Sequence, residues 1–311
     1  MRNAFADEVT KLAAADERIV LLSGDIGNRL FDGYKAAFPE RFYNCGVAEA
    51  NMMSMAAGMA MSGMRPVVYT IVPFVTTRCL EQIRVDVSYH HQPVVIVGVG
   101  GGLSYASLGG THHACEDIAL LRVLPDMAVI CPGDAVEVRG AMRSALASPH
   151  PAYVRLGKKN EPVVHESEPD FEIGKSITVR DGSDVALLAV GNLLPMACEA
   201  ADRLAADGVS VRVESFHTVK PLDERCLADV FGGCAVVAVI EEHSRVGGAG
   251  SAVAEWLARS DGGERRARLL SIGTDDAFLH EAGSQAYARK RLGLTAEDVA
   301  ARVAAAMAKR S

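Results

Sequence analysis

The chain has 311 residues, of which 49% are hydrophobic, and a formal net charge of −7. This length allows large cores and favours two domains, while the acidic balance, without a stripe of lysine or arginine, argues against nucleic-acid binding. The seven scattered cysteines form no CxxC pair and no apolar span reaches about twenty residues, so we expect a soluble cytoplasmic protein with reduced thiols and no membrane partner.

The first half of the chain alternates strands and helices. The predicted strands are residues 19–22, 66–71, 94–99, 127–131 and 152–155, and the predicted helices are residues 3–14, 31–37, 49–61, 76–89, 115–123 and 135–147. Continuous apolar strands separated by helices indicate a parallel sheet that is covered on both faces.

The second half repeats this alternation after a polar stretch. Residues 161–175 lack periodicity and are predicted to be a linker. Strands are predicted at 184–190, 210–214, 235–240 and 268–272, and helices at 196–206, 223–230, 249–258 and 296–308. The sequence therefore predicts an α/β protein with two doubly wound domains, residues 1–160 and a smaller domain at 176–311.

Glu49 is the most informative residue of the first half. It lies in the first turn of a predicted helix that is apolar on nearly every face, and such a helix is buried in a core or between subunits. A carboxylate in that place is partly desolvated and available for proton sharing. The alternative is that it only complements the helix dipole. Asn44 and Gly46 are expected to end the preceding strand and to cap the helix.

Several side chains follow predicted strands at the edge where ligands bind in open α/β sheets. Asp25 is either a ligand contact or a turn residue. Tyr69 and Phe74 either stack on a flat ring or pack in the core. Arg155 suits a phosphate or carboxylate, although a salt-bridged surface arginine is the more common case.

A glycine-rich stretch, residues 98–103, runs into a long loop that ends in Thr111-His112-His113. A dinucleotide-binding loop would open a helix directly, so this stretch does not fit one. Adjacent histidines diverge and make poor metal ligands, and we predict no metal site on this chain. One histidine facing a cleft at the sheet edge is the candidate functional group. A second glycine turn, residues 247–250, is expected to be a close-packed turn rather than an anion site.

In chain order, these segments resemble the C-terminal section of transketolase-type, thiamine diphosphate-dependent enzymes. The resemblance covers nearly the whole chain and rests on Ser23-Gly-Asp-Ile-Gly, Gly46-Val-Ala-Glu, the stretch 70–74, Glu81-Gln, Thr111-His, Arg155, Lys220-Pro-Leu-Asp and Glu241-Glu-His-Ser. It implies a pyrimidine-binding domain followed by a smaller transketolase C-terminal-like domain.

One motif of the family is absent. Members hold the diphosphate through a magnesium ion bound by a Gly-Asp-Gly motif, which this sequence lacks. The resemblance therefore implies that thiamine diphosphate is shared with a partner, an N-terminal transketolase subunit that carries the diphosphate domain and binds Mg²⁺. The expected assembly is an α2β2 heterotetramer.

The resemblance also implies roles for the residues named above. Glu49 matches the carboxylate that hydrogen-bonds N1′ of the cofactor's aminopyrimidine and assists proton removal at thiazolium C2. Phe74 matches the residue that stacks on the pyrimidine, with Val75 as a rival alignment, because one extra residue precedes Glu81. Tyr69 and Asp25 are placed on the cofactor side of the pocket.

On the substrate side, His112 matches a histidine that contacts a substrate hydroxyl or carbonyl, with His113 beside it. Arg155 falls where relatives have an arginine for a sugar phosphate. Leu108 stands where transketolases and deoxyxylulose phosphate synthases have an aspartate that reads sugar hydroxyls. An ordinary pentose phosphate is therefore not assumed to be the substrate.

These observations predict one subunit of a split transketolase that transfers a two-carbon ketol unit from a ketose donor to an aldehyde acceptor. The alternatives are the β subunit of a 2-oxo acid dehydrogenase E1 component, which also lacks the diphosphate motif, and a deoxyxylulose phosphate synthase-like carboligase. A non-catalytic scaffold is disfavoured by the presence of Glu49.

Overall fold

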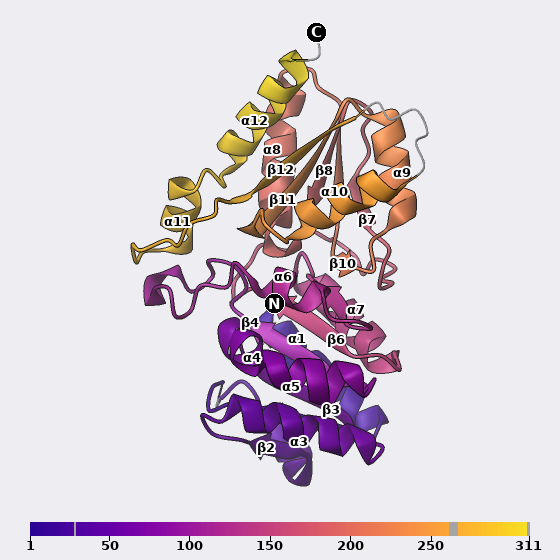
Figure 1. Ribbon diagram of the computed structural model, residues 1–311, viewed down its shortest axis with the longest axis vertical. Coiled ribbons are helices and arrows are strands. Elements are labelled where there is room, and N and C mark those ends of the chain that lie inside the picture. The colour runs from indigo at the N-terminus through magenta and orange to yellow at the C-terminus, as the bar shows by residue number, and fades with distance from the viewer. Residues whose placement is uncertain (28, 261–266, 310–311) are drawn as a thin grey trace.

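The computed structural model describes residues 1–27, 29–260 and 267–309. Two sheets, each flanked by helices, follow one another along the long axis of the molecule (Figure 1). Nearly all strand pairs are parallel, which confirms the predicted fold class of two doubly wound α/β units. Within the described residues, every helix is too short or too polar to cross a membrane.

The first sheet has seven strands in the order β10-β5-β6-β4-β3-β1-β2. Only β10 is antiparallel to its neighbour. The inner strands are apolar because they are buried along their whole length, as the continuous apolar runs indicate. The strands are β1 (Ile19–Ser23), β2 (Phe42–Asn44), β3 (Arg65–Ile71), β4 (Val95–Val99), β5 (Ala128–Ile130), β6 (Ala152–Leu156) and β10 (Thr218–Lys220).

Helices cover both faces of this sheet. One face carries α1 (Arg2–Ala15) against α7 (Ala135–Ala147). The other carries α3 (Glu49–Met61), which packs on β3 and on the segment that follows β3. Short helices outside the segment after β3 are α2 (Asp32–Ala37), η1 (Pro39–Arg41), η4 (Ala106–Leu108) and α6 (Asp117–Arg122).

The segment after β3 differs from the single helix predicted at 76–89. It begins earlier and is divided into α4 (Val72–Val75), η2 (Thr77–Cys79), α5 (Leu80–Gln82) and the π-helical η3 (Ile83–Tyr89). Pro73 fits the first turn of α4, where a missing N–H costs nothing. The Thr76 hydroxyl donates to the Val72 carbonyl and the helix breaks there.

The second sheet has five strands in the order β12-β11-β8-β9-β7, with only β7 antiparallel. They are β7 (Ile177–Arg180), β8 (Val185–Ala189), β9 (Val211–Ser215), β11 (Val236–Ser244) and β12 (Arg268–Thr274). The helices around it are η5 (Gly191–Leu193), α8 (Leu194–Ala206), α9 (Glu224–Gly233), α10 (Ala249–Arg259), α11 (Gln285–Arg291) and α12 (Ala296–Ala308). Figure 1 shows α8 and α12 on one face and α9 and α10 on the other.

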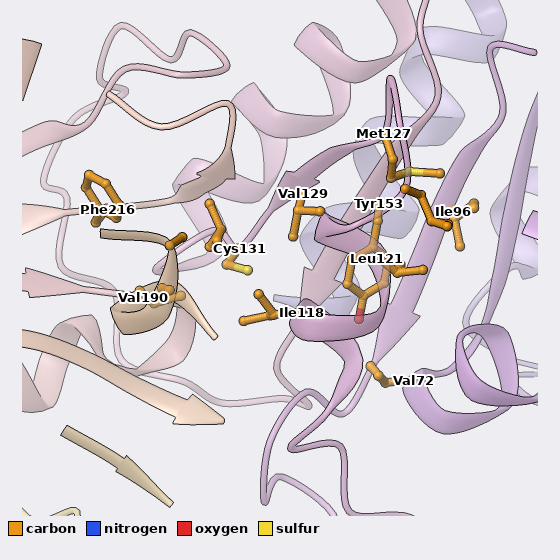
Figure 2. Packing of buried hydrophobic residues seen from close by; sticks show 14 of the residues in the cluster. Val72, Ile96, Ile118, Leu121, Met127, Val129, Cys131, Tyr153, Val190 and Phe216 are labelled. Atoms are coloured by element: carbon orange, nitrogen blue, oxygen red, sulfur yellow. The ribbon is translucent and has the colours of Figure 1, made fainter. Parts of the chain in front are cut away.

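The two units share one apolar cluster. Figure 2 shows Ile118, Val129 and Cys131 of the first unit lying toward Val190 and Phe216 of the second, and all five side chains are buried. Strand β10 adds to the contact, because it comes from the second half of the chain and pairs with β5 of the first sheet. The carboxyl edge of the first sheet is thus backed by the second unit.

Candidate active site

Glu49 is the first residue of α3, and its side chain is only 4% exposed. The helix begins after Ala48 without a side-chain cap, so the expectation that Asn44 and Gly46 cap it is wrong. The Asn44 side chain instead donates to the Asp25 carboxylate (3.0 Å) and accepts from the Gly46 amide (3.0 Å). These hydrogen bonds hold the turn that precedes α3, and this turn positions Glu49 at the sheet edge.

Backbone from the end of β1 approaches the same carboxylate closely. A Cβ on Gly24 would lie 3.0 Å from the Thr70 hydroxyl and 3.6 Å from Glu49 Oε1. Only glycine leaves this space open. The Thr70 hydroxyl is buried and has no hydrogen-bond partner, so an unused polar group faces the neighbourhood of Glu49.

Phe74 and Arg78 belong to the same group of side chains as Glu49 and Thr70. Arg78 Nη1 donates to Glu49 Oε2 at 2.7 Å, and the guanidinium lies over the Phe74 ring, 4.3 Å from its centroid. The Cys79 thiol donates to the Phe74 carbonyl and holds that turn. Burial, and then the nearby Glu49 carboxylate, raise the pKa of Cys79 to about 12, so this thiol stays neutral.

The glycine-rich loop brings His112 to Phe74. Their ring centroids are 5.2 Å apart in an edge-to-face arrangement. Burial and then the charge of His113 lower the pKa of His112, so the imidazole is neutral at neutral pH. Its Nδ1 lies 2.9 Å from the Thr111 hydroxyl, while His113 Nε2 lies 3.4 Å from the Ala106 carbonyl.

The second unit anchors this loop. A Cβ on Gly102 would lie 2.6 Å from Glu242 Cγ, so the loop backbone rests directly on β11. Glu242 is fully buried and pairs with Arg289 of α11 (2.8 Å), while Gln285 also donates to it. Leu108, on the same loop, is 52% exposed and its side chain remains available to a ligand or partner.

Two of the predicted cofactor residues lie apart from this group. The Tyr69 ring is buried against Phe5 in a stacked pair (5.2 Å), on the sheet face opposite Thr70. The core-packing alternative therefore describes Tyr69. Asp25 is exposed at the rim and holds the Asn44 turn. Val75 is fully buried in the core, which leaves Phe74 as the aromatic residue that faces the site.

Arg155 is placed in a buried ion pair. Its guanidinium donates to the Asp117 carboxylate (2.7 and 3.2 Å) and to the carbonyls of Ala114 and Glu242, and both charged side chains are at most 3% exposed. Burial lowers the pKa of Arg155, but the Asp117 charge outweighs it, so the pKa lies above its ordinary value. Arg155 thus joins the first sheet to β11. It is salt-bridged, as the alternative expected, but it is buried rather than at the surface.

The second glycine turn is closed by the chain itself. Glu241 is fully buried and accepts from the amides of Ala249 (2.7 Å) and Gly250 (2.9 Å) at the start of α10. Burial raises the pKa of Glu241 to about 7, against the opposing effect of these two hydrogen bonds. The position that an anion would take is filled by Glu241, as expected for a close-packed turn.

The arrangement suits a flat nitrogen heterocycle. A buried carboxylate, an aromatic face and a neutral imidazole meet, and the group already accommodates the planar guanidinium of Arg78. Such a site can hold a ring between Phe74 and Glu49 and can move a proton at the carboxylate. Among the residues that the structure describes, no cluster of three His, Cys, Asp or Glu side chains could bind a metal ion.

Sequence reasoning missed two residues of this group, Arg78 and Thr70. Arg78 follows Phe74 by four residues, but the two lie in separate short helices, α4 and η2, on either side of the break at Thr76. No local pattern therefore pairs Arg78 with Phe74. Thr70 lies on the strand face opposite Tyr69, so strand alternation would have found it once Tyr69 was assigned to the core.

Both halves of the chain match models of one protein family, and known relatives match along most of its length. The family model "Transketolase, pyrimidine binding domain" matches residues 1–163, and "Transketolase, C-terminal domain" matches residues 174–299. A putative transketolase C-terminal section of Methanocaldococcus jannaschii is 35% identical over 99% of this chain and 96% of its own length. One of the subunits of an apulose-4-phosphate transketolase, from Phocaeicola vulgatus, is 36% identical over 83% of this chain and 84% of its own.

A solved structure shows the same fold. A split-gene transketolase, described as an inactive β4 tetramer, superposes with a TM-score of 0.90 at 34% identity, over 99% of this chain and 98% of that chain.

Proposed function

Because this chain belongs to the transketolase family, and is a transferase subunit within it, we propose that it supplies the pyrimidine-side half of a split, thiamine diphosphate-dependent active site. The proposal rests on one observation: Glu49 is 4% exposed at the start of α3, and the guanidinium of Arg78 contacts both its carboxylate and the face of Phe74. When bound, thiamine diphosphate would supply the carbanion chemistry of ketol transfer.

The chain's own residues then have distinct tasks. Glu49 accepts and returns a proton at N1′ of the aminopyrimidine, and Phe74 holds that ring by stacking. His112, neutral and 5.2 Å from Phe74 between ring centroids, contacts the substrate hydroxyl or carbonyl, with His113 beside it. Asp25 shapes the rim through Asn44. A sugar phosphate contact by Arg155 would require its Asp117 pair to open.

The partner is proposed to be an N-terminal transketolase subunit that binds Mg²⁺ and the diphosphate, in an α2β2 heterotetramer. Exposed apolar side chains around α3 support such an interface: Val47 is 79% exposed and Met61 is 53% exposed. The absence of a Gly-Asp-Gly motif supports a diphosphate site on another chain.

The seven free cysteines support a cytoplasmic location. The domain boundaries, at 160 and 176, stay a prediction.

The function is tested by mixing both chains with thiamine diphosphate and Mg²⁺ and measuring ketol transfer from ketose phosphates to a panel of aldehydes. We expect transfer only with both chains present. Oxidative decarboxylation of 2-oxo acids without ketol transfer would instead identify a 2-oxo acid dehydrogenase subunit. Carboligation of pyruvate to an aldehyde would identify the synthase-like alternative.

In the same assay, Leu108→Asp is expected to shift kcat/KM toward hydroxylated aldoses. Leu108 is exposed on the loop that carries His112, and an apolar side chain there cannot pair with a sugar hydroxyl. Cofactor affinity should barely change, and Leu108→Asn serves as the uncharged control. Loss of thiamine diphosphate binding without a change in acceptor ranking would show that this loop serves the cofactor instead.

A further inference from the structure

Arg78 occupies the place that the proposed function gives to the aminopyrimidine. Its guanidinium meets the two groups assigned to that ring: it donates to Glu49 Oε2 at 2.7 Å and lies 4.3 Å from the Phe74 centroid. A guanidinium is planar, stacks on aromatic faces and donates through N–H groups in its plane. In these respects it is equivalent to a protonated aminopyrimidine.

We propose that Arg78 is a placeholder for the cofactor ring: it contacts the Glu49 carboxylate and the face of Phe74, and must leave both before the ring can bind. This inference rests on the proposed function. The ring and the guanidinium cannot both stack on the same face of Phe74 and pair with the same carboxylate oxygen. The site is therefore closed by its own chain until a ligand displaces Arg78.

The surroundings explain why the placeholder is needed. Glu49 is 4% exposed, and a buried carboxylate without a partner is costly. In the part of the chain that the structure describes, the ion pair of Glu49 is with Arg78, while the nearby Thr70 hydroxyl and the neutral Cys79 thiol supply no positive charge. Arg78 thus compensates the charge of the buried Glu49 carboxylate.

The surroundings also explain how Arg78 can leave. Its side chain is 44% exposed, so the guanidinium can move into water without burying a charge. The backbone on either side is fixed, because the Cys79 amide donates to the Thr76 carbonyl and Cys79 is fully buried. Only side-chain rotation is required, so opening does not disturb Phe74.

The test uses the full isolated chain and the probe 4-amino-2-methylpyrimidine, which lacks the diphosphate and does not depend on the partner. Binding is followed by NMR titration. Arg78→Ala is expected to lower the Kd of the probe about tenfold, equivalent to about 1.4 kcal/mol, because the ring no longer displaces a cation–π contact and an ion pair. Arg78→Lys, which keeps the charge without the planar group, should lie between Arg78→Ala and the unchanged chain.

Arg84→Ala is the matched control, since Arg84 is an exposed arginine further along the same segment, and it should leave the Kd unchanged. Circular dichroism verifies that each variant is folded. An unchanged or higher Kd for Arg78→Ala, or no binding of the probe to it, would overturn the placeholder. The proposed function is tested separately through Glu49: if Glu49→Gln abolishes turnover of the two-chain enzyme but Arg78→Ala leaves the Kd unchanged, only the placeholder fails.

Discussion

Glu49→Gln is expected to lower the turnover of the two-chain enzyme by about 10²–10⁴-fold, the usual contribution of a positioned acid–base group. The amide has nearly the same shape as the carboxylate and can still meet the ring, but it cannot accept and return a proton at N1′. Glu49 is buried at the start of α3, so the substitution changes a carboxylate that the fold holds in place. Turnover is measured under saturating thiamine diphosphate, so that weaker binding does not mimic lost catalysis.

Glu40→Gln is the control for this experiment, because Glu40 is an exposed glutamate of η1 away from the site. It should keep full activity. Near-normal turnover of Glu49→Gln would mean that Glu49 only complements the dipole of α3, and the assignment of the pyrimidine site would fall with it.

Asp117→Ala is expected to lower the free energy of unfolding by about 3–5 kcal/mol, because it leaves the guanidinium of Arg155 buried without its partner. The two side chains are 2% and 3% exposed, and Tyr153 also donates to Asp117 at 2.6 Å. Since Arg155 in turn donates to the Glu242 carbonyl, the loss should affect both units of the chain. Urea unfolding followed by circular dichroism measures the effect.

The control is Asp275→Ala, which removes an exposed ion pair with Arg245 and should cost at most about 1 kcal/mol. A substitution of Arg155 itself separates its two interpretations, a substrate contact and a buried ion pair. If Arg155→Met changes only the KM for phosphorylated substrates and leaves unfolding untouched, then Arg155 binds substrate and the buried pair with Asp117 is not its main role.

The sequence predicts most of the fold because burial periodicity is a local signal. Helices α3, α7 and α12 have the predicted bounds. Strands β7 and β10 and helix α11 were missed, and each depends on distant partners. β10 is three residues long and forms only by pairing with β5 of the other unit, which no local pattern can reveal. The periodicity of a sequence does not indicate which strands pair between two domains.

The site is predictable in part for the same reason. Glu49, Phe74 and His112 follow predicted strands or begin a predicted helix, and parallel topology brings such positions to one edge. Whether Tyr69 faces the site or the core depends on which face of β3 the site occupies. The partners of Arg78 and Arg155 depend on which charges the tertiary fold brings near, since a long side chain can reach several neighbours. These contacts follow only from coordinates.

The central claim is that this chain carries half of a thiamine diphosphate site and needs a second polypeptide for the other half. Isothermal titration calorimetry with thiamine diphosphate and Mg²⁺ tests it most directly, first on the isolated chain and then on the chain mixed with its N-terminal partner. We predict no tight binding to the chain alone and Mg²⁺-dependent binding to the mixture. Tight, Mg²⁺-dependent binding to the isolated chain would contradict the split-site account.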